Sequence, residues 1–179
     1  MGKGTLIRGL RSRIPALELS VSATTRKPRP GEENGADYHF LSDAEFDRLV
    51  EAGEFVEWAE YAGRKYGTLR AELEDRVNAG RPVVLEIEVQ GARQIREAMP
   101  EAEQVFIAPP SVDALRERLV GRGTDAAEDV ERRLATALDE LEAEPEFGHV
   151  VVNDRLETAV GELERIVRDS LDRPLDSDT

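Results

Sequence analysis

The first residues of the chain suit phosphate binding. Gly2-Lys3-Gly4-Thr5 stands ahead of an apolar and basic run. Glycines let a backbone approach phosphate oxygens closely, free N–H groups at a helix start donate to them, and a lysine neutralises their charge. A phosphate-binding loop has Ser or Thr directly after this lysine, whereas this chain has Gly4 there and Thr5 next. A flexible basic start is therefore the competing interpretation.

A second stretch, "SATTRKPRPGEENGADY", offers two guanidinium groups and a phenol. Arg26 and Arg29 lie three residues apart around a proline, which keeps this loop extended. Two guanidinium groups aimed at one point suit a phosphate dianion through bidentate geometry and charge, and Tyr38 adds a phenolic donor. A solvated basic turn is the alternative, but the acidic composition around this stretch favours anion binding.

A third stretch, "EFVEWAEYAGRKYGT", places a carboxylate and a hydroxyl on the two arms of a predicted hairpin, at Glu57 and Thr68. A carboxylate accepts from N–H and amino groups of a purine edge, and a hydroxyl donates to a carbonyl. Together they would recognise guanine if buried. On its own, Glu57 is more often a solvated strand residue.

Two further groups of charged residues follow. Glu86 and Glu88 end the strongest predicted strand, where open α/β sheets bind ligands and where Mg²⁺ finds hard oxygen donors, often through water. Arg118, Arg122 and Arg133 surround a Gly-flanked turn, and mobile arginines closing over a phosphoryl group would stabilise its charge. For the arginines, an exposed helical hairpin with salt bridges is the alternative.

Apolar spacing predicts the elements that position these groups. Helices are expected at 5–13, 42–53, 69–79, 92–99, 112–142 and 156–171, and strands at 17–24, 38–41, 81–89, 104–108 and 149–153, with a hairpin around Ala62-Gly63. Ser42, with Glu45 three residues on, predicts a capping box at the start of the helix 42–53. The run 81–89 is apolar enough to be buried on both faces of a parallel sheet. Buried strands alternating with helices predict an α/β fold, and the hairpin-rich stretch 22–68 predicts an inserted lobe.

Composition excludes several classes of function. The chain has 179 residues and no cysteine, so one domain without disulfides or thiolate metal sites is expected. No apolar stretch approaches the roughly 18 residues that cross a bilayer, and no signal pattern is seen, so a cytoplasmic protein without a membrane partner is expected. A net charge of −14 argues against nucleic acid. Residues 1–31 nevertheless carry seven basic residues against Glu18 alone, which favours a small anionic ligand.

Taken in order, these segments closely resemble guanylate kinase, a family of P-loop enzymes that phosphorylate GMP with MgATP. The resemblance runs from "GKGT" through "VSATTRKPRPGEENGADYHF", "EFVEWAEYAGRKYGT", "LEIEVQGARQI" and "RLVGRGTD" to "VVVND", near residue 154. It implies an α/β fold of the P-loop nucleoside monophosphate kinase type, a parallel sheet core with helices on both faces. The core would comprise 1–21, 81–110 and 134–179, the inserted mixed-β GMP-binding lobe 22–80, and a helical lid 111–133.

The resemblance also implies a role for each matching residue. The clamp on the GMP phosphate would be Arg26, Arg29, Tyr38 and Tyr66, and the guanine readers Ser22, Glu57 and Thr68, supported by Glu32 and Glu86. ATP would contact Gly2, Lys3, Gly4, Thr5 and Asn153, and Mg²⁺ would accompany ATP, reached through water by Glu88. The groups acting in phosphoryl transfer would be Lys3, Arg26, Arg118, Arg122 and Arg133.

The sequence departs from the family in two places. Glu88 stands where the family commonly has Asp, which lengthens the reach toward the metal. The first core strand and the opening half of the P-loop do not precede Gly2, which suggests the hypothesis that Met1 is a mis-assigned start and that the natural protein is longer. Activity of the chain as written, use of dGMP and a homodimer are left open. The alternative function is a non-catalytic guanylate-kinase-like module that binds GMP or a phosphorylated peptide.

Overall fold

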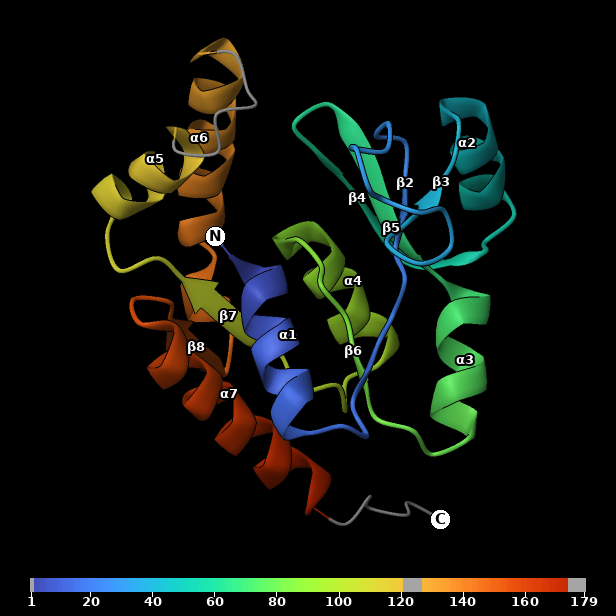
Figure 1. Ribbon diagram of the computed structural model, residues 1–179. Helices are drawn as coiled ribbons and strands as arrows, with labels where there is room; N and C mark the ends of the chain where they lie inside the picture. The colour runs from blue at the N-terminus through green and yellow to red at the C-terminus, as the bar shows by residue number, and fades with distance from the viewer. Residues whose placement is uncertain (1, 121–126, 174–179) are drawn as a thin grey trace.

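The computed structural model describes residues 2–120 and 127–173, with the backbone alone for residues 119 and 127–133. The helices are α1 (Lys3–Arg13), α2 (Asp43–Glu51), α3 (Arg70–Asn78), α4 (Val89–Ala98), α5 (Val112–Val120), α6 (Ala127–Leu141) and α7 (Leu156–Leu171), with a 3₁₀ turn at Glu144–Glu146. The strands are β1 (Glu18–Leu19), β2 (Ala23–Thr24), β3 (His39–Phe40), β4 (Phe55–Tyr61), β5 (Arg64–Leu69), β6 (Val83–Val84), β7 (Val105–Ala108) and β8 (His149–Val152). This alternation of strands and helices confirms the α/β class (Figure 1).

Outside the inserted lobe, the described parallel strands form two separate pairs. β1 pairs with β6, and β7 pairs with β8, both in parallel. Within the described residues no ladder joins β6 to β7, and a cavity of about 410 Å³ lies between them. The prediction that 81–89 is a strand buried on both faces is wrong, because only Val83–Val84 pairs, residues 82–89 are half-buried and Arg81 is exposed.

The predicted strand 17–24 is also wrong as a single element. The extended chain leaves its partner β6 after the amide of Ser20 donates to the Val84 carbonyl at 3.1 Å. It then enters a different sheet as β2, where the Ser22 carbonyl accepts from the His39 amide at 2.9 Å. Alternating apolar residues indicate an extended backbone, but they do not specify which strand it pairs with.

The inserted lobe is a mixed four-stranded sheet in the order β3-β2-β5-β4, on the side of Figure 1 where α2 lies. Its hairpin turns at Ala62 and Gly63, both with positive φ, as a two-residue turn between twisted strands requires. The predicted capping box of α2 is present, with Ser42 and Glu45 bonded reciprocally. Phe46 of α2 stacks on Phe55 of β4 at 4.4 Å between ring centroids, which joins helix and sheet.

The main core lies between α1 and α7. The buried side chains of this cluster are Leu6, Leu10, Ile14, Leu17, Val151, Ala159, Val160, Leu163 and Ile166. A smaller cluster of Leu115, Leu134 and Ala137 joins α5 to α6, which together form the projection beside α1 in Figure 1. In the described ranges, no helix is both long and apolar enough to span a bilayer.

Candidate active site

The start of α1 brings the phosphate-binding residues of the N-terminus beside two strand ends. Gly2 has φ 81°, a left-handed conformation, and a Cβ there would lie 3.0 Å from Nδ2 of Asn153, the residue after β8. A Cβ on Gly4 would lie 3.4 Å from a Glu86 carboxylate oxygen. Three separate segments therefore meet around Gly2-Lys3-Gly4, and glycine permits their close approach.

Lys3 is held by the end of segment 85–88, which follows β6. Its ammonium group donates to Glu88 Oε2 at 2.9 Å and to the Ile87 carbonyl at 3.0 Å. Burial opposes the charge on Lys3, but the Glu88 carboxylate outweighs it, so the pKa of Lys3 is raised. The amine is thus a fixed positive charge at the helix start. Thr5, in the first turn, is exposed, and its hydroxyl accepts from Arg8 at 3.3 Å.

Glu140, on α6, was not among the residues singled out from the sequence. Its side chain is buried near the Glu88 carboxyl, and its Oε2 has no hydrogen-bond partner among the described residues. Burial, together with the charge of Glu88, raises the pKa of Glu140 to about 8, while Lys3 overcomes burial and keeps the pKa of Glu88 lowered. At neutral pH the protonated form of Glu140 therefore prevails beside the ionised Glu88 carboxylate.

Glu86 and Glu88 were the candidates for a metal. Among the described residues, no group of three or more His, Cys, Asp or Glu side chains could hold an ion by itself. Mg²⁺ bound with a nucleotide needs only one or two carboxylates, because phosphates and water supply its other oxygen ligands. Glu86, next to Gly4, and Glu88, next to Lys3, supply such oxygens, so these residues fit a nucleotide-bound ion and not a cage made of protein alone.

The residues expected to bind the GMP phosphate meet in the inserted lobe. Arg26 pairs with Glu32 through two hydrogen bonds of 2.9 Å each, and Glu32 also accepts from the backbone N–H of Arg29 at 2.6 Å. The Arg26 guanidinium lies 5.2 Å from the Tyr38 ring centroid, and the Tyr38 and Tyr66 rings are 6.3 Å apart. Hydrogen bonds from Arg26 lower the pKa of Glu32 despite some desolvation. Glu32 thus holds one guanidinium of the predicted clamp, whereas the Arg29 side chain is exposed.

The two predicted guanine readers are in contact. The Thr68 hydroxyl donates to Glu57 Oε1 at 2.7 Å, and the two residues are 0% and 3% exposed. Burial raises the pKa of Glu57, and the hydrogen bond from Thr68 offsets part of that rise. Glu57 is therefore not the solvated strand residue that was its alternative reading. Ser22, at the beginning of the same lobe, is half-buried.

Gly91 is a second residue that sequence analysis missed. It lies in the first turn of α4, and a Cβ there would lie 2.0 Å from Glu57 Oε2. Only a residue without a side chain permits this approach. The "VQGA" stretch offered a signal, since a glycine inside a helix lowers helix stability and so requires a reason in packing or function.

The predicted lid arginines are only partly described. Arg118 lies in the last turn of α5 and is half-buried. Arg122 lies outside the described residues, and Arg133 is described by its backbone position in α6 alone. The grouping of these three arginines therefore stays a prediction.

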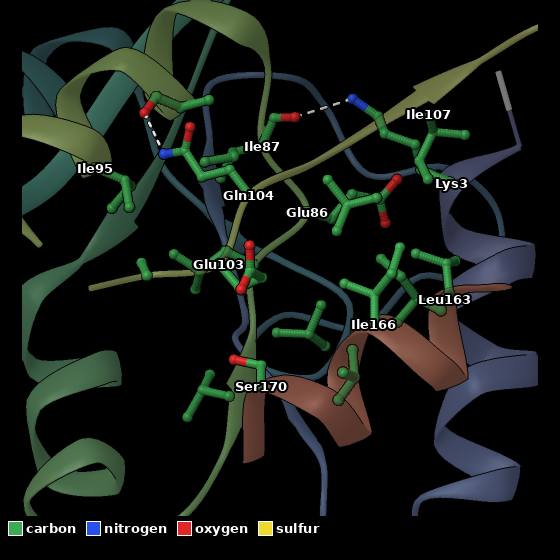
Figure 2. A pocket seen from close by; sticks show the side chains of 18 of the residues that line it. Lys3, Glu86, Ile87, Ile95, Glu103, Gln104, Ile107, Leu163, Ile166 and Ser170 are labelled. Carbon is green, nitrogen blue, oxygen red and sulfur yellow. Dashed lines mark hydrogen bonds between the residues drawn. The ribbon is translucent and has the colours of Figure 1, made fainter. Parts of the chain in front are cut away.

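Figure 2 shows the cavity between the strand pairs, with Lys3 and Glu86 at one end and Leu163 and Ile166 of α7 along its wall. Its lining is mainly apolar and includes Leu6, Leu10, Val84 and Phe106. Such a lining does not suit the charged phosphates of a nucleotide. The predicted ligand-binding groups lie elsewhere: one set lies at the end of the cavity near Lys3 and Glu86, and the other lies in the inserted lobe.

The fold is the α/β fold expected of a nucleotide-binding phosphotransferase, and it holds two separate groups of predicted anion-binding residues, at the start of α1 and in the inserted lobe. The sequence model of guanylate kinase matches residues 1–170. The chain is 56% identical to "Guanylate kinase" of Synechococcus sp. (strain CC9311), over 92% of this chain and 87% of that protein. It is 55% identical to "Guanylate kinase" of Streptomyces coelicolor, over 91% and 83%.

The structure agrees with the sequence comparisons. The crystal structure of guanylate kinase from Anaplasma phagocytophilum is similar, with a TM-score of 0.78 and 34% identity over 93% of this chain and 82% of that one. The chain belongs to the guanylate kinase family.

Proposed function

We propose that this chain transfers the γ-phosphoryl group of ATP to GMP, giving ADP and GDP. The observation that carries the proposal is the buried Glu57–Thr68 pair, beside the lobe that holds Arg26 and the two tyrosines. A carboxylate accepts from the N1–H and amino group of guanine, and a hydroxyl that rotates can donate to its carbonyl. One lobe thus holds groups suited to bind guanine and groups suited to bind a monophosphate.

The start of α1 is suited to bind ATP, the phosphoryl donor. Free N–H groups at the beginning of α1 and the fixed charge of Lys3 suit the phosphates of ATP, and Asn153 lies next to Gly2. Glu86 and Glu88 would hold Mg²⁺ through its water ligands. When bound, that ion neutralises phosphate charge and polarises the transferred group. The protein's own contribution is to align the two nucleotides and exclude water between them.

The arginines of the predicted lid complete the proposal. Arg118, Arg122 and Arg133 would approach the transferred group and stabilise its charge, with Arg26 doing so from the acceptor side. Acceptance of dGMP, a homodimer and a cytoplasmic location stay predictions.

The alternative, a non-catalytic module for GMP or a phosphorylated peptide, is not favoured. A peptide ligand makes no use of a buried purine-reading carboxylate, and a module without ATP makes no use of a half-buried lysine–carboxylate pair at a helix start. The relatives that match this chain over almost its whole length are named guanylate kinase.

The test is ADP release from MgATP by the 179-residue chain, with GMP, dGMP or AMP as acceptor. We expect release with GMP and at least 100-fold less with AMP. Lys3→Met should lower kcat at least 100-fold, because the ATP phosphates lose a fixed charge, whereas Lys27→Met, at an exposed loop position, should stay within twofold. A folded sample that binds GMP but releases no ADP would favour the binding module instead.

A further inference from the structure

Gln94, in the middle of α4, forms hydrogen bonds with the backbone of β4. Its side-chain amide accepts from the N–H of Trp58 at 3.1 Å and donates to the carbonyl of the same residue at 2.6 Å. The amide also donates to the Gln90 carbonyl at 3.2 Å, one turn earlier in the helix, which fixes its orientation. The Gln94 side chain therefore pairs with both backbone groups of one residue, as a neighbouring strand would.

Trp58 lies on the open edge of the lobe sheet. β4 is the last strand in the order β3-β2-β5-β4, so its ladder partner is β5 on one side only. An open edge leaves backbone N–H and C=O groups unpaired, and Gln94 supplies an acceptor and a donor to one such pair. Both backbone groups of Trp58 thus point away from β5 and toward α4.

The ladder on the β5 side is irregular next to Glu57. Phe55 pairs with Leu69, and Glu57 pairs with Thr68. One residue, Val56, thus has no counterpart on β5 and forms a β-bulge. A bulge disrupts the ladder locally and changes the direction in which a neighbouring side chain points. The pairing with β5 therefore fixes the backbone at Glu57 less firmly than a regular ladder would, and the contact of the next residue with Gln94 compensates for this.

Gln94 and Gly91 lie on the same face of α4. They are three residues apart, the spacing at which residues of a helix are neighbours. A Cβ at Gly91 would lie 2.0 Å from Glu57 Oε2, so the helix backbone adjoins the carboxylate itself. The helix, which packs against β4 (Figure 1), therefore meets two consecutive residues of that strand: the backbone of Trp58 and the carboxylate of Glu57.

We infer that Gln94 is a positioning residue for recognition of the guanine base, which holds the edge of β4 against α4 and thereby fixes the Glu57 carboxylate beside Thr68. The inference rests on the proposed function, because it deepens the role given there to Glu57. Gln94 acts through Glu57 and not through a contact of its own with the base. Its loss weakens the binding of guanine and leaves the hydrogen bonds of Lys3 on the ATP side unchanged.

The first experiment removes the hydrogen bonds of the amide with Gln94→Met, which has nearly the volume of glutamine. Glu97→Met, at an exposed position one turn later in α4, is the matched control. We expect Gln94→Met to raise the KM for GMP at least fivefold and to keep the KM for ATP within twofold, whereas Glu97→Met stays within twofold for both. A rise in both KM values of Gln94→Met, or in neither, would overturn the inference. Circular dichroism checks folding, and Gln94→Glu, which loses the donor to the Trp58 carbonyl, replaces Gln94→Met should the latter not fold.

Discrimination between GMP and IMP separates positioning from a merely structural role. IMP has the N1–H and the carbonyl of GMP but lacks the 2-amino group, a donor to a carboxylate. We expect the ratio of kcat/KM for GMP to that for IMP to fall at least fivefold in Gln94→Met. General loss of stability lowers both values together, so an unchanged ratio would overturn the inference.

A double variant tests whether Gln94 acts through Glu57. In a Glu57→Gln background, Gln94→Met should lower the ratio for GMP over IMP no further, because the carboxylate that Gln94 positions is already lost. Fully additive losses in the double variant would overturn the inference.

Two measurements that need no catalysis distinguish failure of this inference from failure of the proposed function. Amide hydrogen exchange at Trp58, followed by NMR, should be at least tenfold faster in Gln94→Met than in Glu97→Met, because the N–H loses its acceptor. The Kd for GMP, measured by calorimetry without ATP, should be at least fivefold higher in Gln94→Met. Absence of ADP release by wild type would refute the function, whereas these two results still decide the role of Gln94. Equal exchange or equal GMP binding in the two variants, including no binding by either, would overturn the inference.

Discussion

Replacing Thr68 by Val tests the guanine-reading pair directly. Valine has nearly the shape of threonine but no hydroxyl, so the 2.7 Å hydrogen bond to Glu57 is removed with little change in packing. Both residues are buried, so water does not replace the lost donor. A hydrogen bond to a charged group contributes about 2 kcal/mol, which corresponds to a factor of about 30 in an equilibrium or rate ratio.

Two measurable effects follow from this loss. The value of kcat/KM for GMP should fall about 30-fold while the KM for ATP stays within twofold, because Lys3 and the start of α1 are unchanged. The melting temperature should fall by about 4–8 °C, since each kcal/mol shifts a domain of this size by about 2–4 °C.

The pH dependence of kcat/KM for GMP gives an independent test of the same pair. The bond from Thr68 lowers the pKa of Glu57, against the rise that burial causes. Its removal should therefore raise that pKa further, so that the acid limb of the kcat/KM profile for GMP moves to higher pH. Only the ionised carboxylate accepts both guanine donors.

Thr68→Ser is the matched control, because it keeps the hydroxyl and removes only a methyl group. It should stay within threefold of wild type for GMP. A Thr68→Val enzyme with an unchanged kcat/KM for GMP would refute the assignment of this pair to guanine. A Thr68→Ser enzyme as impaired as Thr68→Val would refute the hydroxyl as the cause.

Two further predictions concern residues that only the structure revealed. Gly91→Ala should destabilise the fold by about 1–3 kcal/mol through overpacking, since its Cβ would lie 2.0 Å from Glu57 Oε2. Urea unfolding should show the loss of stability, and the KM for GMP should change because Glu57 is displaced. An unchanged KM would contradict the contact. Burial and the charge of Glu88 raise the pKa of Glu140 from an ordinary value of 4.5 to about 8 in the folded protein, so its contribution to stability is complete below about 4.5 and is lost as the pH rises through about 8. Wild type should therefore lose more free energy of unfolding between pH 6 and 9 than Glu140→Gln, as urea midpoints would measure; equal losses would contradict the shift.

Local patterns predicted the elements whose stability is local. The capping box at Ser42, the hairpin turn at Ala62-Gly63 and the last helix at 156–171 were all predicted, and the structure confirms them. In each case the determining contacts are a few residues apart in sequence, so side-chain type and spacing are sufficient.

Strand length and pairing could not be predicted in the same way. The run 81–89 is rich in apolar residues, but among the described residues Val83–Val84 pairs with β1 alone, and its other edge faces the cavity. The alternating run 17–24 divides between two sheets. Whether an extended segment forms a ladder depends on a neighbour distant in sequence, which periodicity does not identify.

The sequence by itself determined the class of fold and the types of chemical group at the site. The order of the glycine-rich start, the arginine loop and the hairpin, with its resemblance to guanylate kinase, indicated two anion sites and a guanine reader. Only the tertiary structure showed that Glu57 is buried against Thr68 and Gly91, and that Glu140 of α6 is buried near Glu88. The physical reason is that the burial of a group and its charged neighbours depend on which distant segments meet. Burial and neighbouring charges in turn set the pKa of each group.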